Sequence, residues 1–298
     1  MMMNRREFLV AAGLAVAGTT LRGAEANKPK AQMAVQLYSI STYIKRNGFG
    51  KTFEELAKIG FKGIEFQHLF GVKPAEVKRM LAANGLTAVG CHVHCDDFLP
   101  ERLKRACDYH LAYGNNLLIC AGGGNFPGPK DNVDEFMKRH VERYNKGAEL
   151  AAKYGCLIGL HNHRHEFDIK LKDGSNYWDY FFTHAGPAVC MEQDVGWTAC
   201  TGNDPCEQWR KYPYRSVTFH AKEDNGWKAG INGRDVKKFD GILGQPAQPG
   251  AFGVKWDEVA VAADADQIPW WVIECEKHFE TLDIVRQSFE FLHRKGRC

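Results

Sequence analysis

The segment CLIGLH, residues 156–161, is a short apolar run that ends in a histidine. Three later segments repeat this pattern: AVCMEQD (188–194), SVTFH (216–220) and WWVIE (270–274). Short, nearly continuous apolar runs of this kind are typical of strands that are buried on both faces of a parallel sheet. The polar residues that end the four runs are His161, Asp194, His220 and Glu274.

Strand-like runs alternate with helix-like stretches along most of the chain. The predicted strands cover residues 33–38, 63–66, 87–93, 117–120, 156–161, 188–192, 216–220 and 270–274. The predicted helices cover residues 52–59, 74–84, 99–113, 133–154, 177–184, 205–209, 256–265 and 281–294. Parallel neighbours need crossover connections, so this alternation predicts a parallel sheet. Eight such units favour a single-domain (β/α)₈ TIM barrel, and no GxGxxG follows the first strand to support an open, doubly wound sheet.

Residues 1–26 have the pattern of an export signal and are not expected to belong to the barrel. Arg5 and Arg6 precede a weakly apolar run, and Ala24-Glu25-Ala26 has the small residues of a cleavage site. The paired arginines resemble a twin-arginine signal. The apolar run, residues 8–18, is too short to span a membrane, so we expect cleavage, no membrane anchor and a periplasmic protein. Residues 27–298 then suit one barrel, which typically has about 250 residues.

Charge and cysteine content narrow the choice of partners. The chain has 39 Lys and Arg against 36 Asp and Glu, and this near balance gives no reason to expect nucleic acid as a partner. Ten cysteines in an exported chain raise the question of disulfides. Most lie in apolar runs, where a free thiol behaves as a small hydrophobic group. Cys200 and Cys206 flank a loop and are the best candidate pair.

The four polar strand ends predict a metal site. The carboxyl ends of barrel strands face one open end, where barrel enzymes place their active sites. His161, Asp194, His220 and Glu274 would meet there, and two imidazoles with two carboxylates suit a divalent ion. Each of these residues alone also fits an ordinary solvated strand end. Their clustering on neighbouring strands favours a site.

Other polar residues near the same end are candidates for contact with a substrate. Alternate side chains of an extended chain share a face, so His163 would point the same way as His161. Trp197 would form an aromatic wall beyond Asp194, and Lys222 would extend the face of His220. The candidates for the other half of the mouth are Gln36, Glu65, His68, His92 and His94.

Six short motifs, in this order, resemble the xylose-isomerase-like TIM barrels, a family of sugar phosphate isomerases and epimerases. They are VQLYS (35–39), GIEF (63–66), LHNHRHEF (160–167), QDVGW (193–197), FHAKED (219–224) and VIECE (272–276). The resemblance implies one divalent ion, Mn²⁺, Mg²⁺, Co²⁺ or Zn²⁺, held at the fifth to eighth strands. Asp194, His220 and Glu274 stand where the family has its Asp, His and Glu ligands. His161 stands where its sugar epimerases have a glutamate.

The resemblance implies a sugar isomerase or epimerase that removes a proton beside a sugar carbonyl, with the ion stabilising the enediolate. Glu274 is the first candidate for the base. His163 and Glu166 are second candidates, as the partner acid or as groups that hold sugar hydroxyls, and Lys222 is a candidate for stabilising oxyanion charge. Because His161 replaces a glutamate, we do not expect a symmetric shuttle between two glutamates.

Two long loops, residues 122–131 and 222–255, follow the fourth and seventh strands. Loops of this length inside a compact domain usually serve as lids or binding loops. Phe126 and Trp227 lie in these loops. Together with Trp197, they are expected either to stack on a sugar ring or to pack within the core or lid.

Three other functions stay open. Elimination of a leaving group after the same proton abstraction would make the protein a 3-keto-glycoside lyase, and an exported enzyme meets glycosides more readily than sugar phosphates. A non-catalytic sugar-binding protein would keep the aromatic walls without needing four ligands. A metal-dependent phosphodiesterase acting on DNA would need a basic groove, which the weak net charge disfavours. The expected partner is a small sugar or glycoside, and a homo-oligomer stays open.

Overall fold

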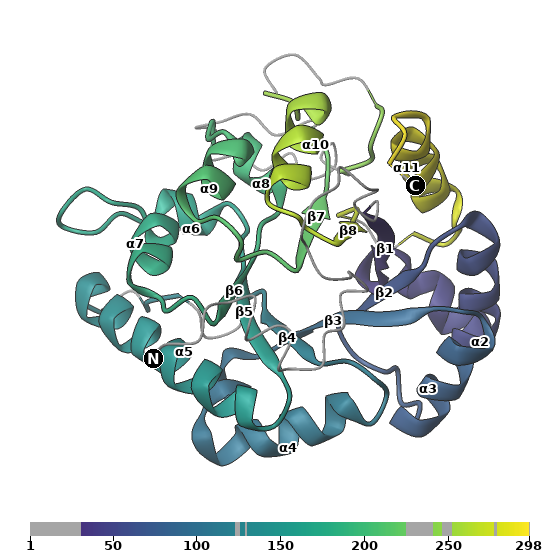
Figure 1. Cartoon of the computed structure of the whole chain (residues 1–298), viewed down its shortest axis with the longest axis horizontal. Coiled ribbons are helices and arrows are strands. Elements are labelled where there is room, and N and C mark those ends of the chain that lie inside the picture. The colour runs from purple at the N-terminus through teal and green to yellow at the C-terminus, as the bar shows by residue number, and fades with distance from the viewer. Residues whose placement is uncertain are drawn as a thin grey trace, which may run out of the picture.

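The structure, a computed structural model, describes residues 31–122, 126–128, 130–224, 241–245, 252–276 and 279–297. Eight parallel strands form a nearly closed barrel, and helices surround it (Figure 1). The predicted fold class is therefore confirmed. The export signal predicted for residues 1–26 lies outside the described residues and stays a prediction.

All eight predicted strands are present, with ends that shift by a few residues. They are β1 (Gln32–Gln36), β2 (Gly63–Phe66), β3 (Thr87–Val93), β4 (Leu117–Cys120), β5 (Leu157–His161), β6 (Val189–Glu192), β7 (Thr218–Ala221) and β8 (Trp270–Ile273). Their order in the sheet is β6-β5-β4-β3-β2-β1-β8-β7. The two ends of this sheet meet where the His220 backbone N–H donates to the Gln193 carbonyl at 2.9 Å. That bond closes the barrel beside the candidate site.

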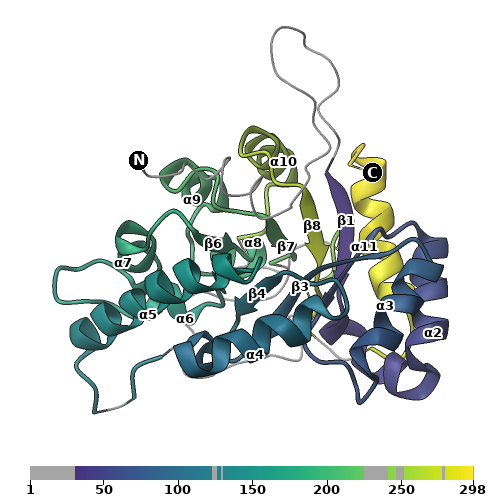
Figure 2. The ribbon, with the colours of Figure 1, turned by 60° about the horizontal axis from the view of Figure 1, so that its bottom comes forward.

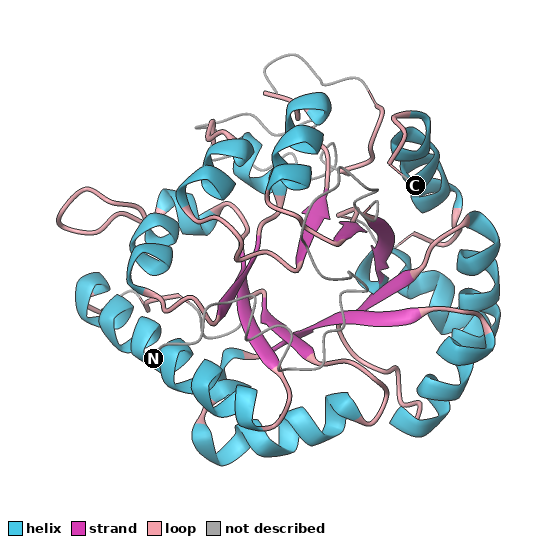
Figure 3. Cartoon of the chain, viewed as in Figure 1, coloured by secondary structure: helices cyan, strands magenta, loops and turns pink. Residues whose placement is uncertain are grey.

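The helices lie outside the strands, as Figures 2 and 3 show. They are α2 (Ser41–Ile59), α3 (Pro74–Ala83), α4 (Pro100–Leu111), α5 (Val133–Lys153), α6 (His165–Asp168), α7 (Tyr177–His184), α8 (Val195–Cys200), α9 (Pro205–Lys211), α10 (Trp256–Ala265) and α11 (Asp283–Arg294). Two 3-10 helices, η1 (Leu37–Ile40) and η2 (Cys95–Phe98), follow β1 and β3. The main hydrophobic core contains large, fully buried side chains such as Trp178, Phe219 and Trp271.

The helix after β1 is longer than predicted, because it begins at Ser41 and not near residue 52. A kink at Gly48, with φ 72° and ψ 169°, divides it, and sequence periodicity revealed only the second half. The short elements η1, η2, α6 and α8 were not predicted, because one or two turns carry too few residues for a periodic signal. Each of them follows a strand, so they shape the mouth of the barrel.

The described cysteines are all buried, and none of them forms a disulfide. The candidate pair Cys200 and Cys206 therefore forms no disulfide in this structure. Cys200 ends α8 and its thiol donates to the Trp197 carbonyl at 3.1 Å, whereas Cys206 lies in the first turn of α9. Within the described part of the chain, no helix is long and apolar enough to cross a membrane.

Candidate metal centre

The structure brings the four polar strand ends together. His161 ends β5, Asp194 precedes α8, His220 lies in β7, and Glu274 follows β8. One ligand atom from each lies within 4.8 Å of the corresponding atom of every other. The first three residues are completely buried, and Glu274 is 7% exposed. Four donors from four strands thus converge in space, as their positions along the chain suggested.

Asp194 is held by backbone hydrogen bonds on both sides. Its own N–H donates to Asn162 Oδ1 at 3.0 Å, which ties the end of β6 to the end of β5. As the N-cap of α8, its Oδ1 accepts the Trp197 N–H at 2.8 Å. Gly196 lets α8 approach β7, since a Cβ there would lie 2.7 Å from the Lys222 carbonyl oxygen. The second carboxylate oxygen, Oδ2, is left facing the cluster.

Lys222 places its ammonium group among three carboxylates. Nζ lies 3.0 Å from Asp194 Oδ2 and 2.8 Å from Glu274 Oε2, and it also contacts Glu276 Oε1. Burial alone would lower the pKa of Lys222, but these negative charges raise it well above its usual value. Burial likewise favours a raised pKa for Glu274, yet Lys222 and His220 hold it well below its usual value. Lys222 is therefore charged and Glu274 ionised.

Further buried or partly buried polar residues lie around the His220 ring. Its Nδ1 is 2.9 Å from Glu274 Oε2, whereas its Nε2 is 2.6 Å from Glu65 Oε2. Gln36 Nε2 donates to the same Glu65 oxygen at 2.9 Å. His92 Nε2 lies 2.9 Å from Glu192 Oε1, and the His92 ring stacks on that of His220 with 5.2 Å between centroids. Gln36, Glu65 and His92 thus belong to the cluster, and their contact with a substrate stays a prediction.

Sequence reasoning gave Glu192 no role. Its Oε1 lies 3.3 Å from His161 Nδ1 and 3.3 Å from His220 Nε2, and the residue is completely buried. Glu192 precedes Asp194 by two positions, so the alternation of an extended chain could have placed both on one face. Burial and the Glu192 charge raise the pKa of Glu65 to about 7.

Two of the predicted contact residues are exposed and lie apart from these groups. His68 packs its ring against Phe70, with 3.9 Å between centroids. His94 caps η2 and accepts the Asp96 N–H at 3.2 Å, and its side chain is 51% exposed. Because the chain turns into η2 directly after β3, His94 does not lie on the same face as His92.

The remaining candidates surround the cluster at its outer side. The His163 ring lies 5.0 Å from that of His161 and 5.8 Å from that of Trp197, so the shared face expected for the two histidines is present. Burial lowers the pKa of His163 to about 3, so its imidazole is neutral. Trp197 Nε1 donates to Glu276 Oε1 at 2.9 Å.

Glu166 lies in α6 and is completely buried. Its Oε2 accepts the His163 N–H at 2.8 Å, and burial raises the pKa of Glu166 to about 8. Phe126 packs against the rings of His165 and Tyr177. Trp227 lies outside the described residues.

The donor atoms fit a divalent ion. Among the residues that the structure describes, neither ring nitrogen of His161 has a hydrogen-bond partner, and Asp194 Oδ2 has none besides its 3.0 Å contact with the Lys222 ammonium group. Buried polar atoms normally have partners, and an ion would supply one to Asp194 Oδ2 and to one of the two ring nitrogens of His161. Imidazole nitrogen with carboxylate oxygen suits Zn²⁺, Co²⁺ and Mn²⁺, and carboxylates suit Mg²⁺.

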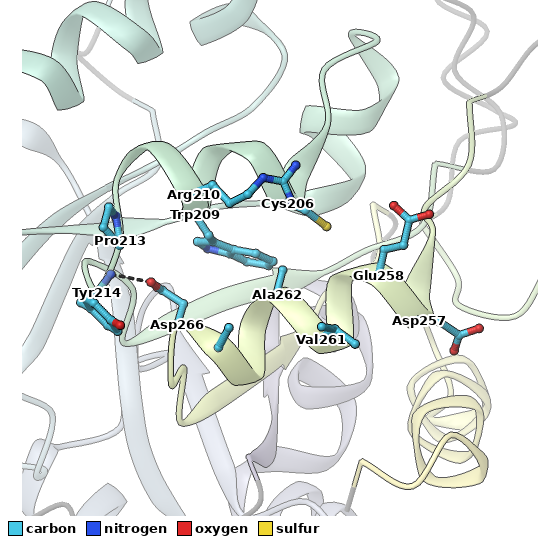
Figure 4. A pocket seen from close by; sticks show the side chains of 11 residues that line it. Cys206, Trp209, Arg210, Pro213, Tyr214, Asp257, Glu258, Val261, Ala262 and Asp266 are labelled. Carbon is cyan, nitrogen blue, oxygen red and sulfur yellow. Dashed lines mark hydrogen bonds between the residues drawn. The ribbon is translucent and has the colours of Figure 1, made fainter.

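A surface groove lies elsewhere, between α9 and α10 (Figure 4). It measures about 680 Å³, and Trp209, Tyr214 and Val261 are among its lining residues. In Figure 4 the Tyr214 N–H bonds to Asp266 at one end of the groove. None of the candidate metal or catalytic residues lines it. We therefore assign no catalytic role to this groove.

Residues 53–295 match the family model of the xylose isomerase-like TIM barrels, and the chain belongs to this family. Over 139 residues it is 30% identical to an inosose dehydratase of Erwinia tasmaniensis. That match covers 40% of this chain and 45% of the relative, so it spans less than half of either protein.

Solved structures agree on the fold. A sugar phosphate isomerase/epimerase from Parabacteroides distasonis superposes with a TM-score of 0.70 at 21% identity, covering 91% of this chain and 96% of that one. A D-allulose 3-epimerase from Methylomonas sp. gives a TM-score of 0.64 at 18% identity, covering 90% and 99% of the two chains. At such identities the likeness shows a shared fold.

Proposed function

We propose that this protein is a divalent-metal-dependent sugar isomerase or epimerase that removes a proton beside a sugar carbonyl. The observation that carries the proposal is the convergence of His161, Asp194, His220 and Glu274, whose ligand atoms lie within 4.8 Å of one another. A non-catalytic sugar-binding protein has no need for four buried ligands on four strands. The structural neighbours include a sugar phosphate isomerase/epimerase and a D-allulose 3-epimerase, which supports the proposed reaction class.

The four residues would hold the ion, with Asp194 and Glu274 supplying two negative charges against its two positive ones. When bound, the ion supplies stabilisation of negative charge that develops on the oxygens of the sugar. Glu274 is the member of the set nearest to solvent, since its side chain is 9% exposed and those of the other three are fully buried. A carboxylate at that position can reach a substrate that enters from the mouth.

The proton is taken by Glu274, which Lys222 and His220 keep ionised. The Lys222 ammonium group lies among the carboxylates of the same site. Its positive charge therefore also stabilises negative charge that develops on the oxygens of the substrate. His163 is neutral, and its ring lies between those of His161 and Trp197. A neutral imidazole of this pKa has no acidic proton to give, so His163 hydrogen-bonds a sugar hydroxyl, and Glu274 returns the proton that it took. Trp197 offers an aromatic wall to the sugar ring.

A second candidate is a lyase that uses the same residues. Removal of the same proton leads to elimination when a leaving group is beta to it. The 30% identity with an inosose dehydratase over 139 residues favours this outcome, although that segment is less than half of the relative. Because we also propose export through the signal at residues 1–26, a 3-keto-glycoside is a suitable substrate class for this reaction.

The two outcomes separate in one experiment. The protein is loaded with Mn²⁺, incubated in deuterated water with a panel of ketoses and 3-keto-glycosides, and followed by NMR. Deuterium incorporation without bond cleavage identifies an isomerase or epimerase, and release of an aglycone identifies a lyase. Sugar binding at full affinity after complete removal of divalent ions, with no exchange under any condition, would identify a binding protein instead.

Export is tested separately. N-terminal sequencing of the protein recovered from a periplasmic fraction should begin at residue 27. An intact Met1 in that material would contradict the proposed signal.

A further inference from the structure

Glu65 and Glu192 have no role in the proposed chemistry, yet both are completely buried in the barrel. Glu65 lies on β2 and Glu192 ends β6. A buried carboxylate is costly unless it is paired. The structure pairs both carboxylates with imidazoles, and among these imidazoles are the two candidate metal ligands His161 and His220.

The two nitrogens of His220 face different carboxylates. Nε2 lies 2.6 Å from Glu65 Oε2, whereas Nδ1 lies 2.9 Å from Glu274 Oε2 and 3.9 Å from Asp194 Oδ2. An imidazole must be neutral to ligate an ion, with one N–H and one lone pair, and a carboxylate oxygen can only accept. With its proton on Nε2 and donated to Glu65, His220 presents its lone pair on Nδ1 to the oxygens of the candidate ligand set.

His161 has a similar relation to Glu192. Its Nδ1 lies 3.3 Å from Glu192 Oε1. A proton on Nδ1 leaves the lone pair of His161 on Nε2, which has no hydrogen bond within the described residues. Glu192 is itself held in place, because His92 Nε2 lies 2.9 Å from its Oε1 and the Thr218 hydroxyl donates to its Oε2.

We infer that Glu65 and Glu192 are positioning residues, which hold His220 and His161 in the tautomers that offer a lone pair to the ion. This inference rests on the proposed metal site. Carboxylates that accept the second N–H of a ligating histidine fix its ring and raise its basicity, and their loss typically weakens metal binding about 10- to 100-fold. Each of the two candidate histidine ligands thus faces a carboxylate from another strand.

A hydrogen bond from β1 and a glycine in β3 accommodate the Glu65 carboxylate. Gln36 Nε2 donates to Glu65 Oε2 at 2.9 Å. A Cβ at position 90 would lie 2.6 Å from Glu65 Oε1, so the glycine of β3 leaves the room that this carboxylate fills. The supporting network therefore extends from β1 through β2 and β3 to β6 and β7.

The test compares Glu65→Gln and Glu192→Gln with the wild-type protein. Glutamine keeps the shape and one acceptor oxygen while it removes the charge. Titration with Co²⁺ should show binding weakened about 10- to 100-fold in both variants, with a changed cobalt absorption spectrum. Long-range ¹⁵N–¹H spectra of the Zn²⁺-loaded wild type should show the His220 proton on Nε2 and the His161 proton on Nδ1, and the same spectra of the two variants show whether either proton has moved.

Glu223→Gln is the matched control. Glu223 is also buried, and it accepts hydrogen bonds from the Trp256 indole at 2.6 Å and from the Val254 N–H at 2.8 Å, away from the histidines. This variant should bind Co²⁺ as the wild type does, with the same spectrum.

Wild-type affinity and spectra in both Glu65→Gln and Glu192→Gln would overturn the positioning role and leave the proposed function intact. Weaker binding with unchanged spectra and unchanged tautomers would also overturn it, because that pattern reflects lost charge or stability alone. A wild-type protein that binds no divalent ion would instead refute the proposed metal site itself.

Discussion

The ammonium group of Lys222 lies 2.8 Å from Glu274 Oε2 and 3.0 Å from Asp194 Oδ2, on the same two carboxylates that we assign to the ion. Lys222 therefore stands next to the candidate centre as a fixed positive charge. It can neutralise these carboxylates, and it can also repel a cation that approaches them. Both effects have measurable consequences.

Replacement of Lys222 by methionine should destabilise the protein in the presence of EDTA by about 3–5 kcal/mol, because the buried carboxylates of Asp194 and Glu274, and the partly exposed one of Glu276, lose their counter-charge. Mn²⁺ should then raise the unfolding temperature more in Lys222→Met than in the wild type. Thermal unfolding with EDTA and with Mn²⁺ measures both effects. Lys295→Met is the control, since its pair with Asp257 is solvent-exposed and should contribute less than about 1 kcal/mol. Equal effects in the two variants would contradict the role given to Lys222.

Asp194→Asn should lower the affinity for a divalent ion at least about 10-fold, because it removes one ligand charge. The amide oxygen can still accept the Trp197 N–H, so α8 keeps its cap and the fold is retained. Equilibrium dialysis with metal analysis gives the affinity. Asp204→Asn makes the same change at the N-cap of α9 and should leave ion binding unchanged. Undiminished binding in Asp194→Asn would remove Asp194 from the ligand set.

Glu274→Gln should lower the rate of deuterium exchange, or of elimination, by about 10²–10⁴-fold even at saturating metal, because an amide cannot accept the proton. The reaction is followed by NMR in deuterated water with the substrate that the wild type turns over. Glu258→Gln, an exposed change on α10, should behave as the wild type. Retained exchange in Glu274→Gln would exclude Glu274 as the base.

Glu166 should make stability fall as the pH rises. Burial raises its pKa from 4.5 to about 8, so between these values the folded protein keeps a proton that the unfolded chain has released. The folded state is thus favoured at the acidic end of this window and loses that advantage toward pH 8.

Glu166→Gln stays neutral and still accepts the His163 N–H, so it should lack this decline. The difference is on the order of 4 kcal/mol at most. Denaturant unfolding of both proteins at pH 5 and pH 8 provides the measurement. Parallel pH dependence in the two proteins would show that Glu166 is ionised in the folded state.

The long elements were readable from the sequence, because apolar runs and helical periodicity are local signals. Trp256–Ala265 and Tyr177–His184 have the predicted ends, and β2 does too. Only the second half of the helix that begins at Ser41 was predicted, because the kink at Gly48 interrupts its apolar periodicity. Short helices such as α8 carry too few residues to be found, although α8 depends on Asp194 as its cap.

The sequence by itself determined the eight alternating units and the polar residues that end the last four strands. Both follow from patterns within a few neighbouring residues. Only the tertiary structure decided that Glu192 contacts His161 and that the Lys222 ammonium group lies among the carboxylates of the site. It also decided that His94 turns away from His92. These contacts join residues from different strands, and their distances depend on strand register and barrel closure, which no local pattern specifies.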